Sequence, residues 1–122
     1  MSARAIRLTA GFFVSDLNAS IAFYERNAFA VGRTNFQDGW SELRLDDIAL
    51  FLLEQFPING VEFLGPNFQV ECLGLAEVRK RMPDAGEFSH TVGISGDVAP
   101  SFVLRDPDQN ILVFSEAGTL SS

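Results

Sequence analysis

The stretch Ile48-Ala49-Leu50-Phe51-Leu52-Leu53-Glu54 follows Asp46-Asp47, and a similar stretch, Ile111-Leu112-Val113-Phe114-Ser115-Glu116, follows Asp106-Pro107-Asp108-Gln109-Asn110. Each is an apolar run that begins after a turn and ends at a glutamate, which is typical of a buried strand. The recurrence of this pattern in a chain of 122 residues indicates an internal duplication. Because neither half would be very stable alone, we expect the two halves to fold together.

The first half, working outward from its last strand, predicts the order strand, helix and three strands. Ile6 to Val14 predicts a mostly buried strand, and Asp16 after it can cap a helix by accepting from free backbone N–H groups. An amphipathic helix of about three turns is indicated by apolar residues at helical spacing, namely Leu17, Ile21, Tyr24 and Ala28. Three short strands then follow at 29–34, 40–45 and 48–54.

The second half repeats this order after a stretch, 56–66, whose Pro and Gly residues predict a linker. Alternation over Phe68 to Cys72 predicts a strand with one buried face, and Leu75, Val78 and Met82 predict a second helix. The remaining strands are expected at 88–94, 102–105 and 111–116. The chain is therefore predicted to be one α+β domain, 1–122, with a βαβββ module at about 5–55 and another at about 67–117.

The composition limits the classes of function. Sixteen acidic and nine basic residues give a net charge of −7, which does not suit a nucleic-acid partner. The apolar runs are too short to span a membrane, and no signal-peptide pattern is present, so a cytoplasmic location is expected. The single cysteine, Cys72, permits no internal disulfide. The acidity fits either a cationic or neutral small ligand, or solubility alone.

Two motifs resemble the vicinal oxygen chelate superfamily, which includes glyoxalase I, bleomycin-resistance proteins and extradiol dioxygenases. The first is Phe13-Val14-Ser15-Asp16-Leu17 with Ser20 and Phe23-Tyr24, and the second is Leu104-Arg105-Asp106-Pro107-Asp108-Gln109-Asn110. The second motif departs from the family at Gln109, where Gly is usual. The resemblance covers nearly the whole chain and implies two tandem βαβββ modules whose mixed sheets curl around a cleft.

The resemblance also implies where metal-using members of the family would place their ligands. Those positions fall at Thr9, near Asn67, and at Phe51 and Val113. None of these side chains is a good ligand for a divalent metal, which needs several His, Asp or Glu side chains. We therefore expect no metal or other cofactor and no catalytic residue. A metal-dependent lyase, isomerase or dioxygenase, with Glu54, Glu116 and His90 as displaced ligands, is the alternative.

Without a metal, the chain most resembles the bleomycin-resistance type, a non-catalytic homodimer that sequesters a flat cationic antibiotic in grooves between subunits. The expected ligand is a planar aromatic or cationic small molecule, because aromatic faces stack on planar rings and carboxylates attract cations. The groove residues implied by this resemblance are Phe36, Asp38, Trp40, Glu42, Phe63 and Phe88.

Several residues have a second interpretation. Trp40 suits either a ligand platform or a dimer interface. Cys72 alternates in phase with buried residues and is interpreted as core rather than as a nucleophile. His90 has no second His to act with, and its polar neighbours favour a structural or surface residue. Glu54 and Glu116 occupy equivalent places in the two halves and could form a carboxylate pair for acid–base work, or could be solvated strand ends.

Overall fold

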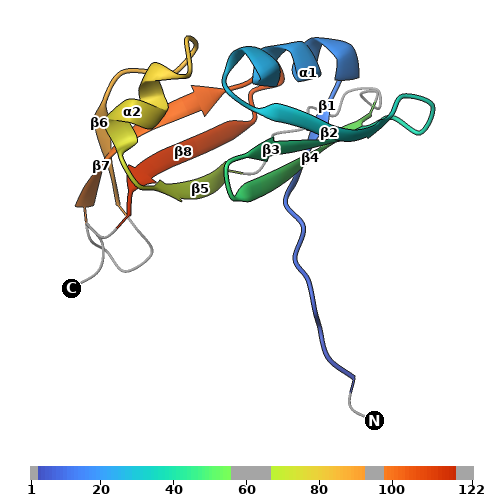
Figure 1. The fold of residues 1–122 in the computed structure, drawn as a ribbon, viewed down its shortest axis with the longest axis horizontal. Coiled ribbons are helices and arrows are strands. Elements are labelled where there is room, and N and C mark those ends of the chain that lie inside the picture. Colours follow the sequence, from blue (N-terminus) through green and yellow to red (C-terminus); the bar gives the residue numbers. More distant parts are fainter. Residues whose placement is uncertain (1–2, 56–66, 93–97, 118–122) are drawn as a thin grey trace, which may run out of the picture.

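The computed structural model describes residues 3–55, 67–92 and 98–117, which form two sheets and two helices. The elements are β1 (Gly11–Val14), α1 (Leu17–Arg26), β2 (Ala30–Asn35), β3 (Trp40–Leu45), β4 (Ile48–Glu54), β5 (Asn67–Cys72), α2 (Leu75–Lys80), β6 (Ser89–Val92), β7 (Val98–Arg105) and β8 (Ile111–Glu116). This is the predicted βαβββ order, twice. Both helices lie on the same side of the two sheets (Figure 1).

The two sheets have equivalent topologies, β1-β4-β3-β2 and β5-β8-β7-β6. In each sheet the first and last strands of the module pair in parallel, and the other neighbours are antiparallel. Register partners of the two parallel pairs include Gly11 with Phe51 and Gln69 with Val113. The α+β class and the tandem mixed sheets are therefore confirmed.

One apolar core is shared by the two modules. It contains Phe12, Leu43 and Leu52 from the first module and Phe102 and Phe114 from the second, all fully buried. The Phe12 ring lies 5.2 Å from the Phe68 ring, across the boundary between β1 and β5. The core therefore joins the two modules, as expected for halves that would not be very stable alone.

Polar contacts join the α1 helix to the turn that precedes β8. The Tyr24 hydroxyl donates to the Asp106 carboxylate at 2.9 Å, and the Asn110 side-chain amide donates to the carbonyl of Phe13 at 3.0 Å. At the surface, the Ser15 hydroxyl donates to Asp108 at 2.7 Å. Both sequence motifs therefore lie at one place, where they hold the modules together.

The capping prediction for α1 is confirmed, because the Asp16 carboxylate accepts from the backbone N–H of Ala19 at 3.1 Å. The turn before β8 places Gln109 at a φ of +69°, in the left-handed region that favours glycine. This explains why a glycine suits that position.

The first strand is shorter than the sequence predicts. Strand pairing begins at Gly11, and residues 3–10 form an extended segment that leaves the body of the molecule (Figure 1). Ile6 and Leu8, expected to be buried, are 84% and 97% exposed. Their apolar character predicts burial, but the pairing of β1 with β4 begins only at Gly11, and these two side chains stay exposed. The predicted linker, 56–66, lies outside the described residues. No helix in the described ranges is long and apolar enough to cross a membrane.

Candidate functional site

The face of the first sheet opposite α1, called here the open face, carries an apolar row across three strands. Trp40 on β3 pairs with Leu53 on β4, and Leu53 pairs with Phe13 on β1. Paired residues point to the same side of a sheet, and side chains on the opposite side, such as Leu52 and Phe12, are buried in the core. Phe13 and Leu53 are 43% and 41% exposed, and Trp40 is partly buried. The row Trp40–Leu53–Phe13 is an apolar platform that a flat ring could cover.

The next row of the open face contains an unusually placed carboxylate. Glu42 pairs with Phe51 on β4 and is only 8% exposed. Arg33 and Arg44 each donate to it, with nitrogen–oxygen distances of 3.4 and 3.3 Å. A buried carboxylate needs such partners, because burial without them would carry a large free-energy penalty.

The β2 strand is shaped to accommodate this carboxylate. Its pairing with β3 shifts register between Val31 and Thr34, so Gly32 and Arg33 lie in an irregular part of the strand. A Cβ atom added to Gly32 would lie 2.8 Å from Oε1 of Glu42, closer than real Cβ contacts come. The absence of a side chain at Gly32 therefore makes room for the Glu42 carboxylate.

We expect Gly32→Ala to displace the Glu42 carboxylate and weaken its two ion pairs. The added methyl group should destabilise the fold by about 1–3 kcal/mol, the usual range for overpacking. Urea unfolding monitored by circular dichroism measures this change, and Gly11→Ala, whose added Cβ would come no closer than 3.3 Å to another atom, is the matched control. Equal stability of the Gly32 variant and the unmodified protein would contradict the tight fit around Glu42.

Beside Glu42 lies a pocket of about 410 Å³ at the base of the N-terminal segment. Its wall is formed by Arg7, Leu8, Thr9, Ala10, Arg33, Glu42, Arg44, Ala49 and Phe51. Three of these residues are arginines and one is acidic. The pocket therefore carries local positive charge although the chain carries −7 overall.

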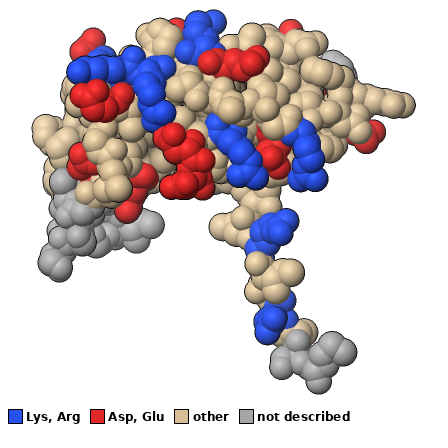
Figure 2. Space-filling view, viewed as in Figure 1, with Lys and Arg blue, Asp and Glu red and all other residues tan. Residues whose placement is uncertain are grey.

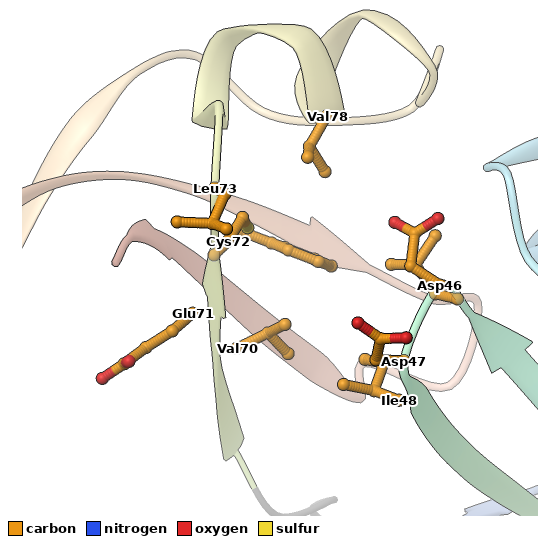
Figure 3. Close-up of a pocket in the computed structure, with 10 residues that line it drawn as sticks. Asp46, Asp47, Ile48, Val70, Glu71, Cys72, Leu73 and Val78 are labelled. Carbon is orange, nitrogen blue, oxygen red and sulfur yellow. The ribbon is translucent and has the colours of Figure 1, made fainter. Parts of the chain in front are cut away.

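A second pocket, of about 310 Å³, lies between the modules (Figure 3). Ile48, Val70 and Val78 form part of its apolar wall, and Asp46 and Asp47 lie at one side. The Asp46 carboxylate is already bound by the Arg81 guanidinium at 2.8 and 3.3 Å. This bidentate contact joins the β3–β4 turn to the end of α2 and holds the pKa of Asp46 below its usual range.

Cys72 also lines the pocket between the modules, where it is partly buried. Burial, and to a smaller extent the nearby Glu116 carboxylate, raise the pKa of this thiol to about 11. A thiol with that pKa is protonated at neutral pH and is a poor nucleophile. This agrees with the interpretation of Cys72 as a structural residue.

The six predicted groove residues do not form one cluster. Trp40 and Glu42 lie on the open face, and Phe36 and Asp38 lie beside them in the β2–β3 turn. Phe36 is 61% exposed, whereas the Asp38 carboxylate accepts from the side-chain amide of Asn35 at 2.9 Å. Phe63 lies outside the described residues.

Phe88 is separated from the other predicted groove residues. Its ring packs against Phe102, a core residue, and lies under the guanidinium of Arg79 from α2, 4.9 Å from the ring centroid. It therefore lies on the helix side of the second sheet. The structure therefore places Phe88 apart from Trp40 within one chain, because sequence order does not reveal on which side of a sheet a loop residue packs.

Glu54 and Glu116 are neither an acid–base pair nor simply solvated strand ends. The Glu54 carboxylate accepts from the backbone N–H of Leu17 at 2.7 Å, at the start of α1. The Glu116 carboxylate accepts from the backbone N–H groups of Gly74 and Leu75, at the start of α2. Each glutamate thus satisfies free N–H groups at the beginning of its own module's helix. Their equivalent sequence positions were a signal of this shared role.

The metal-binding positions implied by the family do not fit a metal. Phe51 and Val113 lie on β4 and β8 with hydrocarbon side chains, and Thr9 offers only a hydroxyl. Within residues 3–55, 67–92 and 98–117, no three His, Cys, Asp or Glu side chains converge as a metal site requires.

Comparison with known proteins identifies the fold. No protein-family model matches the chain, and no curated protein matches its sequence. Among solved structures, a bleomycin-binding protein in complex with bleomycin is 19% identical, with a TM-score of 0.67 over 92% of this chain and 98% of that one. A bleomycin-resistance determinant encoded on the transposon Tn5 is also 19% identical, with a TM-score of 0.69 over 93% and 99% of the two chains.

An enzyme of the same architecture also matches. Lactoylglutathione lyase from Agrobacterium tumefaciens is 15% identical, with a TM-score of 0.67 over 99% of both chains. Binding proteins and an enzyme thus share this arrangement of strands and helices over nearly the full length of the chain. The chain therefore has the fold of the vicinal oxygen chelate superfamily, as the resemblance of its two motifs implies.

Proposed function

We propose that this chain is a small-molecule binding protein of the vicinal oxygen chelate superfamily, and that it holds a planar aromatic ligand on its open face. The observation that carries the proposal is the Trp40–Leu53–Phe13 row, an apolar surface on the sheet face opposite α1. Stacking of a flat ring on Trp40 would bury apolar area on both partners. The two bleomycin-related neighbours support binding as the activity.

A cationic ligand was predicted because Asp38 and Glu42 would attract it, so the contacts of these two carboxylates test that part of the prediction. Glu42 is bound by two arginines and Asp38 by Asn35. Glu42 is therefore not an open partner for a cation, whereas Asp38 is exposed and contacts the neutral amide of Asn35. The geometry therefore supports the planar aromatic part of the prediction more than the cationic part.

We further propose that two copies of the chain form the binding groove together. Phe36 is 61% exposed on the β2–β3 turn, and Ile6 and Leu8 are 84% and 97% exposed on the N-terminal segment. We infer that a second copy of the chain covers Ile6 and Leu8, because they lie on a segment that leaves the body of the molecule. Light scattering should give a mass near twice 13.4 kDa at micromolar concentration, and a single chain at that concentration would overturn the groove between copies.

The binding proposal is tested with the intrinsic fluorescence of the single tryptophan. A panel of planar compounds, with bleomycin, neutral aromatics and aromatic acids as its members, should contain at least one that quenches Trp40 saturably. If no compound of the panel changes the fluorescence at millimolar concentration, the platform is not a binding site. Bleomycin itself tests whether antibiotic sequestration, the role implied by the resemblance, applies to this chain. The cytoplasm, predicted from the sequence, is the compartment we propose for this role.

A metal-dependent reaction is the second candidate and follows from the lactoylglutathione lyase neighbour. The residues at the ligand positions do not supply the donors that it needs. We propose that the chain binds its ligand without a cofactor. Elemental analysis of protein purified without chelator decides between the candidates, because a stoichiometric, tightly held transition metal would favour the enzyme.

A further inference from the structure

The arginine-lined pocket beside Trp40 has more positive charge than is needed to balance the Glu42 carboxylate. One guanidinium would balance one carboxylate, yet Arg33 and Arg44 both contact Glu42 and Arg7 lines the same pocket. Within the described ranges, Arg7 lies within 4 Å of no carboxylate. The basic side chains lie beside the base of the N-terminal segment and along it (Figure 2). The pocket thus has two positive charges that no described carboxylate balances.

The two arginines that hold Glu42 keep most of their hydrogen-bonding capacity. Each uses one nitrogen on Glu42, at 3.4 Å for Arg33 and 3.3 Å for Arg44, and their side chains are 79% and 59% exposed. A guanidinium has five N–H groups in a planar fork that suits two oxygens of one carboxylate. Glu42, at 10% side-chain exposure, therefore acts as an anchor that directs two exposed guanidinium groups toward the pocket.

The pocket is at the correct distance from the aromatic platform for one ligand to use both. Trp40 and Glu42 are two residues apart on β3 and point to the same face. Such residues are separated by about 6.6–6.8 Å along a strand. A ligand whose ring lies on the platform therefore has to span only this distance along the sheet to reach the arginines.

We propose that Arg7, Arg33 and Arg44 bind the carboxylate group of the ligand, which is therefore an aromatic acid rather than an aromatic cation. This inference rests on the proposed function, because it assigns the other half of the same ligand. The apolar platform and the positive pocket together orient the ligand. Its ring lies over Trp40 and Leu53, and its carboxylate lies in the pocket. Cationic aromatics are disfavoured by the same guanidinium groups.

The test uses three probes with one ring system: 4-biphenylcarboxylate, 4-biphenylmethanol and 4-biphenylmethylamine. Binding is followed by the NMR signal of the Trp40 indole N–H, so the absorbance of the probes does not interfere. The acid should bind roughly tenfold more tightly than the alcohol, the effect expected of one charge-assisted contact, and the amine more weakly than both. Added salt should weaken the binding of the acid and leave the affinity for the alcohol unchanged.

The variants Arg7→Met and Arg33→Met test whether these two arginines cause the acid to bind more tightly than the alcohol. Each variant removes one exposed cation and leaves Glu42 with at least one arginine, so both should fold. Either variant should reduce the acid's advantage over the alcohol several-fold. Lys80→Met, which removes the same charge from the exposed face of α2, is the matched control and should leave that advantage unchanged.

The outcomes separate the two proposals. If acid and alcohol bind equally, or if the arginine variants keep the full preference, the inference is overturned and the platform remains a binding site. If none of the three probes shifts the Trp40 signal at millimolar concentration while bleomycin or another planar cation does, the inference also fails. If no planar compound of any charge binds, the proposed function fails and the inference fails with it.

Discussion

Replacing Asp106 by alanine should destabilise the protein by about 4 kcal/mol, the largest effect expected of any single substitution at a polar residue. Asp106 is 2% exposed and accepts four hydrogen bonds. The donors are the Tyr24 hydroxyl, the side-chain amide and backbone N–H of Asn110, and the backbone N–H of Asp108. Alanine would leave these donors without their acceptor, and buried donors without partners are costly.

The position of Asp106 explains why the loss should affect the whole molecule. The Tyr24 hydroxyl comes from α1 of the first module, and Asp106 belongs to the turn before β8 of the second. Burial raises the pKa of Asp106, and the hydrogen bonds from Asn110 and Tyr24 act in the opposite direction. The contact between the modules therefore depends on a buried carboxylate. Hydrogen bonds from its donors must offset the free-energy cost of removing that carboxylate from water.

Thermal and urea unfolding measure this prediction, with an expected fall of roughly 15 °C in the unfolding midpoint. Tyr24→Phe, which removes one donor and leaves Asp106 three others, should cost only about 1–2 kcal/mol. Asp108→Ala, at a more exposed position in the same turn, should cost less than about 1 kcal/mol. Equal effects of the three substitutions would show that the Asp106 network does not hold the modules together.

Replacing Trp40 by alanine should weaken the binding of a planar aromatic ligand by about ten- to a hundredfold, the equivalent of 1–3 kcal/mol for a lost stacking contact. Trp40 begins β3 and its side chain lies in the apolar row of the open face. The residue is not part of the apolar core, so the variant should fold. Calorimetric titration with an aromatic probe measures the loss.

Two controls make the Trp40 prediction specific. Phe88→Ala removes another exposed aromatic ring, but from the helix side of the second sheet, and should leave the affinity unchanged. Light scattering of the Trp40 variant shows whether the residue holds two copies together. If the variant binds as tightly as the unmodified protein, or if the Phe88 variant loses as much affinity, the platform is not where the ligand stacks.

The fold could be predicted from the sequence because its signals are local and repeated. The strands at 40–45, 48–54 and 111–116 have the predicted bounds, and Asp16 caps α1 as predicted. These features depend on alternation, turn residues and capping within a few positions of the chain. The prediction failed at Ile6 and Leu8, because apolar composition predicts burial and cannot show that strand pairing begins only at Gly11.

The candidate site could be predicted only in part. Trp40 and Glu42 were both predicted to line the groove, and alternation along β3 places them on one face of the sheet. The arginines of the pocket were not predicted, although alternation along β3 also places Arg44 on the face of Glu42. Arg33 reaches Glu42 through an irregularity in β2, and Arg7 lies 35 positions before Glu42 in the chain. Spacing patterns do not report such contacts, and the net charge of −7 concealed a local positive pocket.

The location of the bound ligand is the most direct test of the open face as the binding site, and NMR chemical-shift mapping with an aromatic probe measures it. We expect the shifts to concentrate on Trp40, Leu53 and Phe13 and to extend toward the arginine-lined pocket. Val70 and Val78, which line the pocket between the modules, should stay unchanged. Shifts confined to that second pocket, with the Trp40 signal unmoved at saturation, would contradict the open face as the binding site.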